Sequence, residues 1–162
     1  MRIREASSAE IPELMDIFVH AREYMRANGN GTQWPDDYPS LEIVESEIAN
    51  SQRFVFDDDG DILGTFSLIA GEDSTYGVIE QGDWSQDAPY STIHRLASWG
   101  KVHGLSRACF DFCTQHADYL RIDTHACNAS MLAAIRSYGF RECGIIHIWD
   151  GTPRIAFDYI VR

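Results

Sequence analysis

The stretch Tyr90–Thr124, which reads YSTIHRLASWGKVHGLSRACFDFCTQHADYLRIDT, carries the pattern that decides the fold. Tyr90 to Ser98 has the β-branched and apolar residues of a strand, and Tyr119 to Thr124 has them again. Between them, the segment from about Gly104 to His116 repeats apolar residues at helical spacing. The stretch therefore predicts a β-α-β unit in the middle of the chain.

Strand and helix patterns also precede this unit. Ser7, with Glu10 three residues later, forms a capping box that predicts the start of a helix. Ser40 can cap a second helix, and the turn sequence DDGD at Asp58–Asp61 predicts an antiparallel hairpin. The expected elements are a strand at 1–6, helices from 7 to 28 and from 40, strands at 53–56 and 62–69, and a short strand or irregular edge at 76–79.

A helix at 129–138 and two strands at 139–149 and 154–161 follow the central unit, with the turn Asp150–Pro153 between the strands. Hairpins at both ends of the chain and a β-α-β unit in its middle predict an α/β fold, a mixed central β-sheet flanked by helices. The 162 residues show no repeat or linker, so we expect one domain spanning residues 1–162.

Charge and composition narrow the classes of partner. The chain has 13 Lys and Arg against 25 Asp and Glu, a net charge of −12. Such a surface argues against nucleic acid or an anionic membrane as the main partner, and it favours a cationic substrate such as an amine. No apolar run approaches the roughly 20 residues of a membrane span, and no signal peptide is visible, so we expect a cytoplasmic protein.

Four cysteines, at positions 109, 113, 127 and 143, show neither a Cys-x-x-Cys pair nor zinc spacing. They are interpreted as small buried apolar side chains in a reducing compartment, which disfavours a redox or metal protein. We therefore expect no metal site.

The order of elements and four local features resemble the GNAT N-acetyltransferase superfamily over essentially the whole chain. The features are IHRLA at 93–97, KVHGLS at 101–106, Asn128, and YGF at 138–140. The family's phosphate-binding pattern is Arg/Gln-x-x-Gly-x-Gly/Ala, and here it reads Lys101-x-x-Gly104-x-Ser106. The segments Asp123-Thr124-His125 and Asp150–Phe157 are similar to one bacterial subgroup of that family.

The resemblance implies a site for acetyl-CoA. It implies that the strand at 90–98 splays from the strand at 119–124, and that Leu96 and Ser98, with Ala97 between them, offer backbone groups to the pantetheine arm. A helix N-terminus binds anions, Gly104 lets backbone approach a pyrophosphate, and Lys101 and Arg107 add positive charge. The residues expected to bind the cofactor are Leu96, Ala97, Ser98, Lys101, Val102, His103, Gly104, Leu105, Ser106, Arg107 and Asn128. In the family Asn128 contacts the pantetheine or positions the acetyl group, and it can also cap the following helix.

Acetyl transfer to an amine needs a base and is helped by an acid. We predict Glu80 as the base, because the 76–79 segment before it should abut the central strand. His94 is the alternative, since a neutral imidazole can act near pH 7 and His94 should share the strand face of Leu96 and Ser98. Members of the family often have, at the position of Ile135, a tyrosine that acts as the general acid toward the departing thiolate. Tyr138, three residues along, is the remaining candidate acid, although it also fits the apolar stripe of its helix.

Three aromatic residues in irregular segments, Trp34, Tyr38 and Trp84, are candidates for lining the substrate pocket. The predicted function is transfer of an acetyl group from acetyl-CoA to the amine of a small molecule or peptide by direct attack. A catalytically silent acyl-CoA-binding sensor or regulatory module is the alternative, supported by the degenerate 101–106 pattern, the short turn before it and Ile135. Because members of the family often dimerise, a homodimer is one possible oligomeric state.

Overall fold

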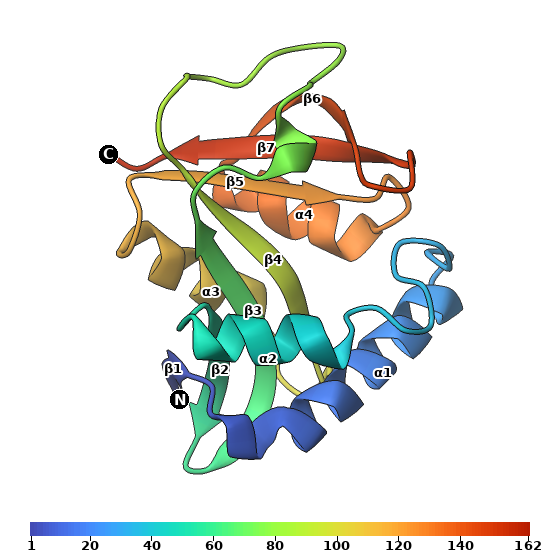
Figure 1. The fold of residues 1–162 in the computed structure, drawn as a ribbon, viewed down its shortest axis with the longest axis vertical. Helices are drawn as coiled ribbons and strands as arrows, with labels where there is room; N and C mark the ends of the chain where they lie inside the picture. The colour runs from blue at the N-terminus through green and yellow to red at the C-terminus, as the bar shows by residue number, and fades with distance from the viewer.

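A computed structural model describes all residues from Met1 to Arg162. Seven strands form one mixed sheet in the order β1-β2-β3-β4-β5-β7-β6, in which β4 and β5 run parallel and the other neighbours antiparallel (Figure 1). The strands are β1 (Arg2–Glu5), β2 (Arg53–Asp58), β3 (Asp61–Ala70), β4 (Ser91–Ser98), β5 (Tyr119–Thr124), β6 (Arg141–His147) and β7 (Pro153–Ile160). The helices are α1 (Ile11–Ala27), α2 (Leu41–Ala49), α3 (Leu105–Thr114) and α4 (Ala129–Tyr138), with 3-10 turns at Ser8–Glu10 and Ser74–Tyr76. The predicted fold class is confirmed.

Local sequence signals set most of these boundaries. The Glu10 carboxylate accepts a hydrogen bond of 2.8 Å from the backbone N–H of Ser7, which completes the capping box. The Ser40 hydroxyl accepts from the N–H of Ile43 at 3.3 Å and starts α2. The optional strand at 76–79 is absent, because Ser74–Tyr76 forms a 3-10 turn that Asp73 caps by accepting from the N–H of Thr75 at 2.9 Å.

The sheet buries an apolar cluster on each face. One cluster packs α3 and α4 against the sheet and includes Phe110, Leu120 and Ile135; the other packs α1 and α2 and includes Phe18 and Val44. Cys109, Cys113 and Cys143 are buried as expected, whereas Cys127 is exposed, because it lies in the turn before α4. None of the helices combines the length and apolar character that crossing a bilayer requires.

The middle of the sheet opens between β4 and β5. The two strands pair only at Ser91 with Leu120 and at Thr92 with Arg121, and then separate. This confirms the predicted splay.

A bulge in β4 lies beside the opening. Across β3 and β4 the register passes from Ser67↔His94 to Thr65↔Ala97, and Arg95 has a φ of +51°. Because the extra residue reverses the alternation, His94 faces the side of Ala97. The prediction that His94 shares the face of Leu96 and Ser98 was therefore wrong.

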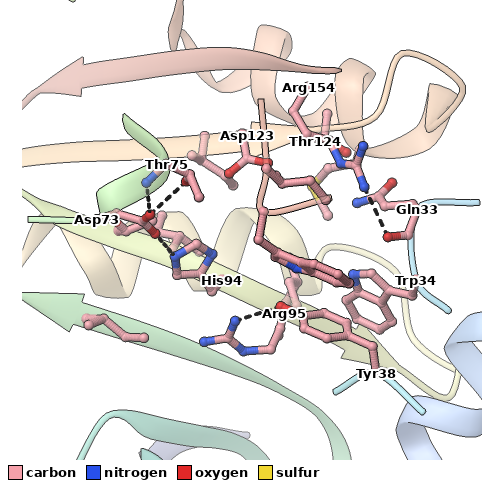
Figure 2. A pocket seen from close by; sticks show the side chains of 18 of the residues that line it. Gln33, Trp34, Tyr38, Asp73, Thr75, His94, Arg95, Asp123, Thr124 and Arg154 are labelled. Atoms are coloured by element: carbon pink, nitrogen blue, oxygen red, sulfur yellow. Dashed lines mark hydrogen bonds and ion pairs between the residues drawn. The ribbon is translucent and has the colours of Figure 1, made fainter. Parts of the chain in front are cut away.

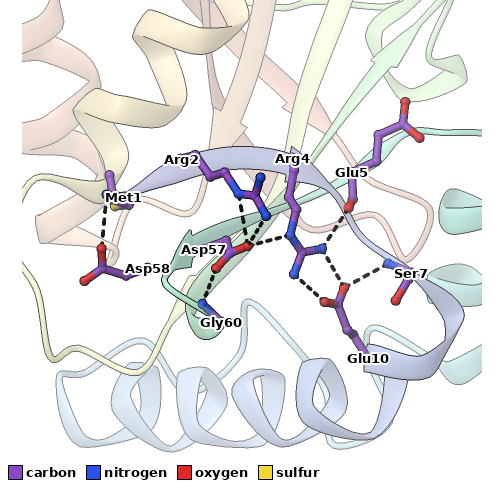
Figure 3. Close-up of polar contacts among 9 residues, drawn as sticks. All are labelled: Met1, Arg2, Arg4, Glu5, Ser7, Glu10, Asp57, Asp58 and Gly60. Carbon is purple, nitrogen blue, oxygen red and sulfur yellow. Dashed lines mark hydrogen bonds and ion pairs between the residues drawn. The ribbon is translucent and has the colours of Figure 1, made fainter.

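The N-terminal strand is held to β2 by the buried carboxylate of Asp57 (Figure 3). Its Oδ2 accepts from Nε of Arg4 at 2.7 Å and from Nη2 of Arg2 at 3.2 Å, and its Oδ1 accepts from the N–H of Gly60 at 2.7 Å. The bonds from Arg4 and Gly60 lower the pKa of Asp57 from 3.8 to about 2.

The lowered pKa of Asp57 predicts an acid-sensitive contribution to stability. A carboxyl whose pKa is lower in the folded state stabilises the fold above its unfolded pKa, and this contribution disappears as the pH falls through the folded pKa. Asp57→Asn should therefore reduce the free energy of unfolding most above a pH of about 4, with the difference from wild type shrinking toward a pH of about 2. Urea unfolding at a series of pH values measures this. Asp59→Asn, an exposed residue of the same turn, is the matched control; a penalty for Asp57→Asn that stays constant with pH would refute the assignment.

Candidate active site

Two cavities meet where β4 and β5 separate. The loop cavity, of about 420 Å³, lies between the splayed strands and the segments 33–38, 71–75 and 148–154. The helix cavity, of about 390 Å³, lies between α1, the start of α3 and α4. Four residues line both cavities: Met25, Leu96, Asn128 and Met131. The two spaces are therefore neighbours that share a wall at the splay.

The helix cavity collects most of the residues predicted to bind the cofactor. Those that line it are Leu96, Ala97, Ser98, Val102, His103, Gly104, Leu105, Ser106 and Asn128. Two predicted residues do not line it: Nζ of Lys101 lies over the Trp99 ring, and Arg107 packs over the Tyr138 ring.

The α3 N-terminus within this cavity has free donors. Gly104 is the N-cap with a φ of +86°, a conformation that suits glycine, and no side chain caps the helix. The first N–H groups of a helix have no acceptor within the helix, so they stay available for an anion. This agrees chemically with a phosphate-binding role for the 101–106 segment.

Sequence reasoning missed the α1 wall of the helix cavity. His20, Ala21, Tyr24 and Met25 all line it. The apolar stripe of α1 predicted Ala21 and Met25 only as core residues. Nothing in the local pattern indicates that one turn of this stripe extends past the sheet and faces α3.

Asn128 lies at the junction of the cavities and caps α4 as predicted. Its Oδ1 accepts from the N–H of Met131 at 3.3 Å, so it caps α4. Its Nδ2 donates to Oε1 of Gln33 at 3.2 Å, which ties the 33–38 segment to the junction.

His94 lies in the loop cavity and is oriented by Asp73, a residue that the sequence did not single out (Figure 2). Nε2 of His94 lies 2.9 Å from Oδ2 of Asp73. Oδ1 of Asp73 accepts from the N–H and the hydroxyl of Thr75 at 2.9 and 2.7 Å. Burial raises the pKa of Asp73, but the bonds from His94 and Thr75 outweigh it and leave that pKa below its ordinary value. An ionised Asp73 holds the proton of His94 on Nε2, which leaves Nδ1 free to accept one.

Other polar groups of the loop cavity come in buried pairs. The Tyr76 hydroxyl donates to Oδ1 of Asp123 at 2.6 Å, and burial, together with that carboxylate, raises the pKa of Tyr76. Arg95 forms an ion pair with Glu47 and donates to the Tyr38 hydroxyl at 2.9 Å. Trp34 and Tyr38 line the cavity as expected, with their rings edge to face at 6.0 Å.

Three sequence-based site residues lie elsewhere. Glu80 is exposed, and its backbone N–H and carbonyl pair with Ile145 of β6, both at 2.8 Å. Because β6 is the outer strand of the sheet, the prediction that this segment abuts the central strand was wrong. Gly82 permits the close approach to β6, since a Cβ there would lie 1.9 Å from the carbonyl oxygen of Cys143. Glu80 lines neither cavity.

Tyr138 and Trp84 are also displaced from the expected sites. The Tyr138 hydroxyl donates to Asp111 at 2.9 Å, and its ring packs on Phe110 of α3, so it belongs to the helix layer and lines neither cavity. Trp84 stacks over Arg121 at 4.0 Å and lines a separate hollow of the 71–90 segment. Tyr138 therefore lies away from the two cavities, which corrects its assignment as the acid, and Trp84 lines a hollow other than the loop cavity in which Trp34 and Tyr38 lie.

Comparison with known proteins agrees with this geometry, although no family model matches the chain. The curated peptidyl-lysine N-acetyltransferase YiaC of Escherichia coli K12 is 28% identical over 138 residues, which span 85% of this chain and 82% of that protein. The crystal structure of a GNAT-family acetyltransferase from Streptococcus agalactiae 2603 matches with a TM-score of 0.86 and 28% identity, covering 99% of this chain and 95% of that one. A GNAT-family acetyltransferase from Listeria monocytogenes 4b F2365 shares the fold, with a TM-score of 0.71 at 14% identity over 98% of this chain and 94% of that one.

The splayed sheet, the uncapped helix N-terminus at the helix cavity and these relatives together define the class of protein. The chain has the fold of the GNAT acetyltransferases, and its sequence relative and structural neighbours identify it as an N-acetyltransferase.

Proposed function

We propose that acetyl-CoA binds in the helix cavity and that an amine acceptor binds in the loop cavity. The observation that carries the proposal is the wall that the cavities share at Leu96, Asn128, Met25 and Met131. A thioester held there would meet an amine entering from the other side of the splay. The free N–H groups at the start of α3 suit the pyrophosphate, and the backbone of β4 beyond Thr92, unpaired with β5, suits the pantetheine arm.

His94 is proposed as the general base. The acceptor enters as an ammonium, and Nδ1 of His94 takes a proton from it, directly or through a water molecule. The amine nitrogen then attacks the thioester carbonyl, so that the C–N bond forms and the C–S bond breaks, and the second proton of the nitrogen passes to water. Asp73 keeps the imidazole in the tautomer that can accept a proton and stabilises the imidazolium that results.

The departing thiolate receives its proton from water in this proposal. Ile135, where the family often has a tyrosine, is completely buried, and the Tyr138 hydroxyl is bound to Asp111. A thiolate is a tolerable leaving group, so the reaction proceeds without a dedicated acid. The acetyltransferase relatives do not favour the silent binding module.

The acceptor is proposed to be a small molecule or a peptide. The E. coli relative is a peptidyl-lysine N-acetyltransferase, whereas the loop cavity of about 420 Å³ has the size of a small-molecule site. A cytoplasmic location suits a chain that depends on acetyl-CoA, and dimerisation stays a prediction.

The proposal predicts that acetyl-CoA binding depends on Gly104 and not on a comparable glycine elsewhere. Gly104 and Gly60 have φ values of +86° and +97°, and a Cβ at either would meet no atom within 4 Å. Alanine at either position should cost similar backbone strain, about 1 kcal/mol. At Gly104 the methyl group would also enter the phosphate site, and affinity for acetyl-CoA should fall about tenfold.

Calorimetry with acetyl-CoA, alongside thermal unfolding, measures both effects. Gly60→Ala should share the stability loss and keep wild-type affinity. An absence of binding to the wild type at high micromolar concentration would overturn the proposed function. Equal affinities of Gly104→Ala and Gly60→Ala for acetyl-CoA would show that the phosphate site does not lie at the start of α3.

A further inference from the structure

Arg154, the second residue of β7, is a buried arginine that forms no ion pair with a carboxylate. It is 3% exposed and lines the loop cavity. Its Nη1 donates to the Thr152 hydroxyl and the Pro153 carbonyl, both at 3.0 Å, and its Nη2 donates to the Gln33 carbonyl at 3.1 Å. All three partners are neutral oxygens, and no carboxylate lies within 4.0 Å of the guanidinium.

The other buried arginines are compensated. Arg53 is paired with Glu47, and Arg121 lies between the rings of Trp84 and Tyr90, each centroid 4.0 Å from its guanidinium carbon. Arg154 has neither kind of partner. A buried charge is costly unless it is paired, and an anion from outside the chain would supply the partner that Arg154 lacks.

The position of Arg154 shows where that anion would enter. A guanidinium has five N–H groups, and the contacts above engage three donations from its two terminal nitrogens. The Nε of Arg154 takes part in none of these hydrogen bonds. One Nη2–H and the Nε–H therefore have no hydrogen-bond partner within the chain, on a residue that lines the loop cavity.

The cavity presents opposite chemistry on its two sides. In Figure 2, Asp73 and His94 lie on one side, whereas Arg154 and Gln33 lie on the other. Asp123 and Asp150 act on Arg154 only through space, since Asp150 is bound to Thr152 and Asp123 to Tyr76. One end of the cavity thus suits an ammonium and the other end suits a carboxylate.

We propose, building on the proposed function, that the acceptor is a free amino acid, whose carboxylate binds Arg154 while its amine faces the His94–Asp73 pair. Gln33, which accepts from Arg154 and from Asn128, completes the wall at the Arg154 end. Arg154 is then a specificity-determining residue: it selects acceptors by their carboxylate and takes no part in the proton transfer.

The experiment compares acceptors that differ only by that carboxylate. The pairs are lysine and cadaverine, ornithine and putrescine, tyrosine and tyramine, and histidine and histamine. Thiol release with acetyl-CoA gives kcat/KM for each. The wild type should prefer the amino acid of its best pair by about 10- to 100-fold, the value of a charge-assisted bond. Arg154→Gln should bring this ratio close to one, and Arg154→Lys should retain part of it.

Arg136→Gln, which removes an exposed arginine of α4 paired with Glu142, is the matched control and should keep the wild-type ratio. The ratio of kcat/KM between the two acceptors of a pair does not change when a variant is merely less stable, since both acceptors are measured with the same enzyme. If Arg154→Gln does not fold, the acceptor panel measured with the wild type and with Arg154→Lys still tests the inference.

Equal or greater activity with the decarboxylated amines overturns the inference, as does an unchanged ratio in the variants. Binding of acetyl-CoA without turnover of any amino acid in the panel also overturns it. These results leave the proposed function standing, whereas a failure to bind acetyl-CoA at all removes the proposed function first.

Discussion

His94→Gln should lower kcat by about 100- to 1000-fold while leaving affinity for acetyl-CoA unchanged, because general-base catalysis contributes on this scale. The side chain lies in the loop cavity, where its Nδ1 has no hydrogen-bond partner. Glutamine preserves much of the volume and can donate to Asp73, but it accepts no proton at neutral pH. The variant must then draw on acceptor molecules that are already deprotonated in solution.

The pH profile separates this role from a structural one. In His94→Gln the rate should rise about tenfold per pH unit while the fraction of free amine rises, and the wild type should rise less steeply. Asp73→Asn should give a smaller loss of kcat, since it disturbs the tautomer of His94 without removing the ring. Glu80→Gln is the matched comparison, because Glu80 is exposed, bridges to β6 and lines neither cavity, and it should keep wild-type kcat. A large loss in Glu80→Gln with a normal rate in His94→Gln would restore the sequence-based assignment.

The sequence predicted the parts of the molecule that depend on neighbouring residues. The capping box at Ser7, the DDGD turn and the helix start at Gly104 each act within a few residues, and each lies where the local pattern indicated. The helix cavity follows from them, because a strand, a tight loop and a helix N-terminus in succession bring 96–98 and 102–106 to one place.

The general base was harder to predict, because neither its partner Asp73 nor the sheet face toward which its side chain points is set by neighbouring residues in the sequence. Asp73 lies 21 residues before His94 along the chain, and only the pairing of β3 with β4 brings them together. The bulge at Arg95 also reverses which side His94 faces, and alternation along a strand cannot reveal an extra residue. The prediction of Glu80 as the base was wrong for a similar reason. Its segment pairs with a strand that lies about 65 residues later in the chain, and the local sequence does not indicate that pairing.

Arg154 is a third case of the same difficulty. The sequence presents it as an ordinary arginine in a strand, a position from which it could equally have reached solvent. Arg154 differs from other arginines because it is buried without an ion-pair partner, and burial depends on the folded structure. A residue of this kind is recognised only after every other charge has been matched with its partner.

Glu47→Gln should reduce the free energy of unfolding by about 3–5 kcal/mol, the usual cost of removing one member of a buried ion pair. The Glu47 carboxylate on α2 is buried and forms ion pairs with both Arg53 of β2 and Arg95 of β4. Burial lowers the pKa of Arg53 to about 10, so this guanidinium keeps its charge at neutral pH. The variant would leave two guanidiniums under α2 with no carboxylate to balance them.

Urea unfolding and thermal melting measure the loss, with each kcal/mol corresponding to about 2–4 °C in a chain of this size. Glu45→Gln, an exposed residue of the same helix, should change stability by no more than about 0.5 kcal/mol. Adding Arg53→Met to Glu47→Gln should recover part of the loss, because it removes one of the two uncompensated charges. A loss below about 1 kcal/mol in Glu47→Gln would mean that water reaches the guanidiniums and that Arg95 and Tyr38 are held in the cavity wall by packing alone.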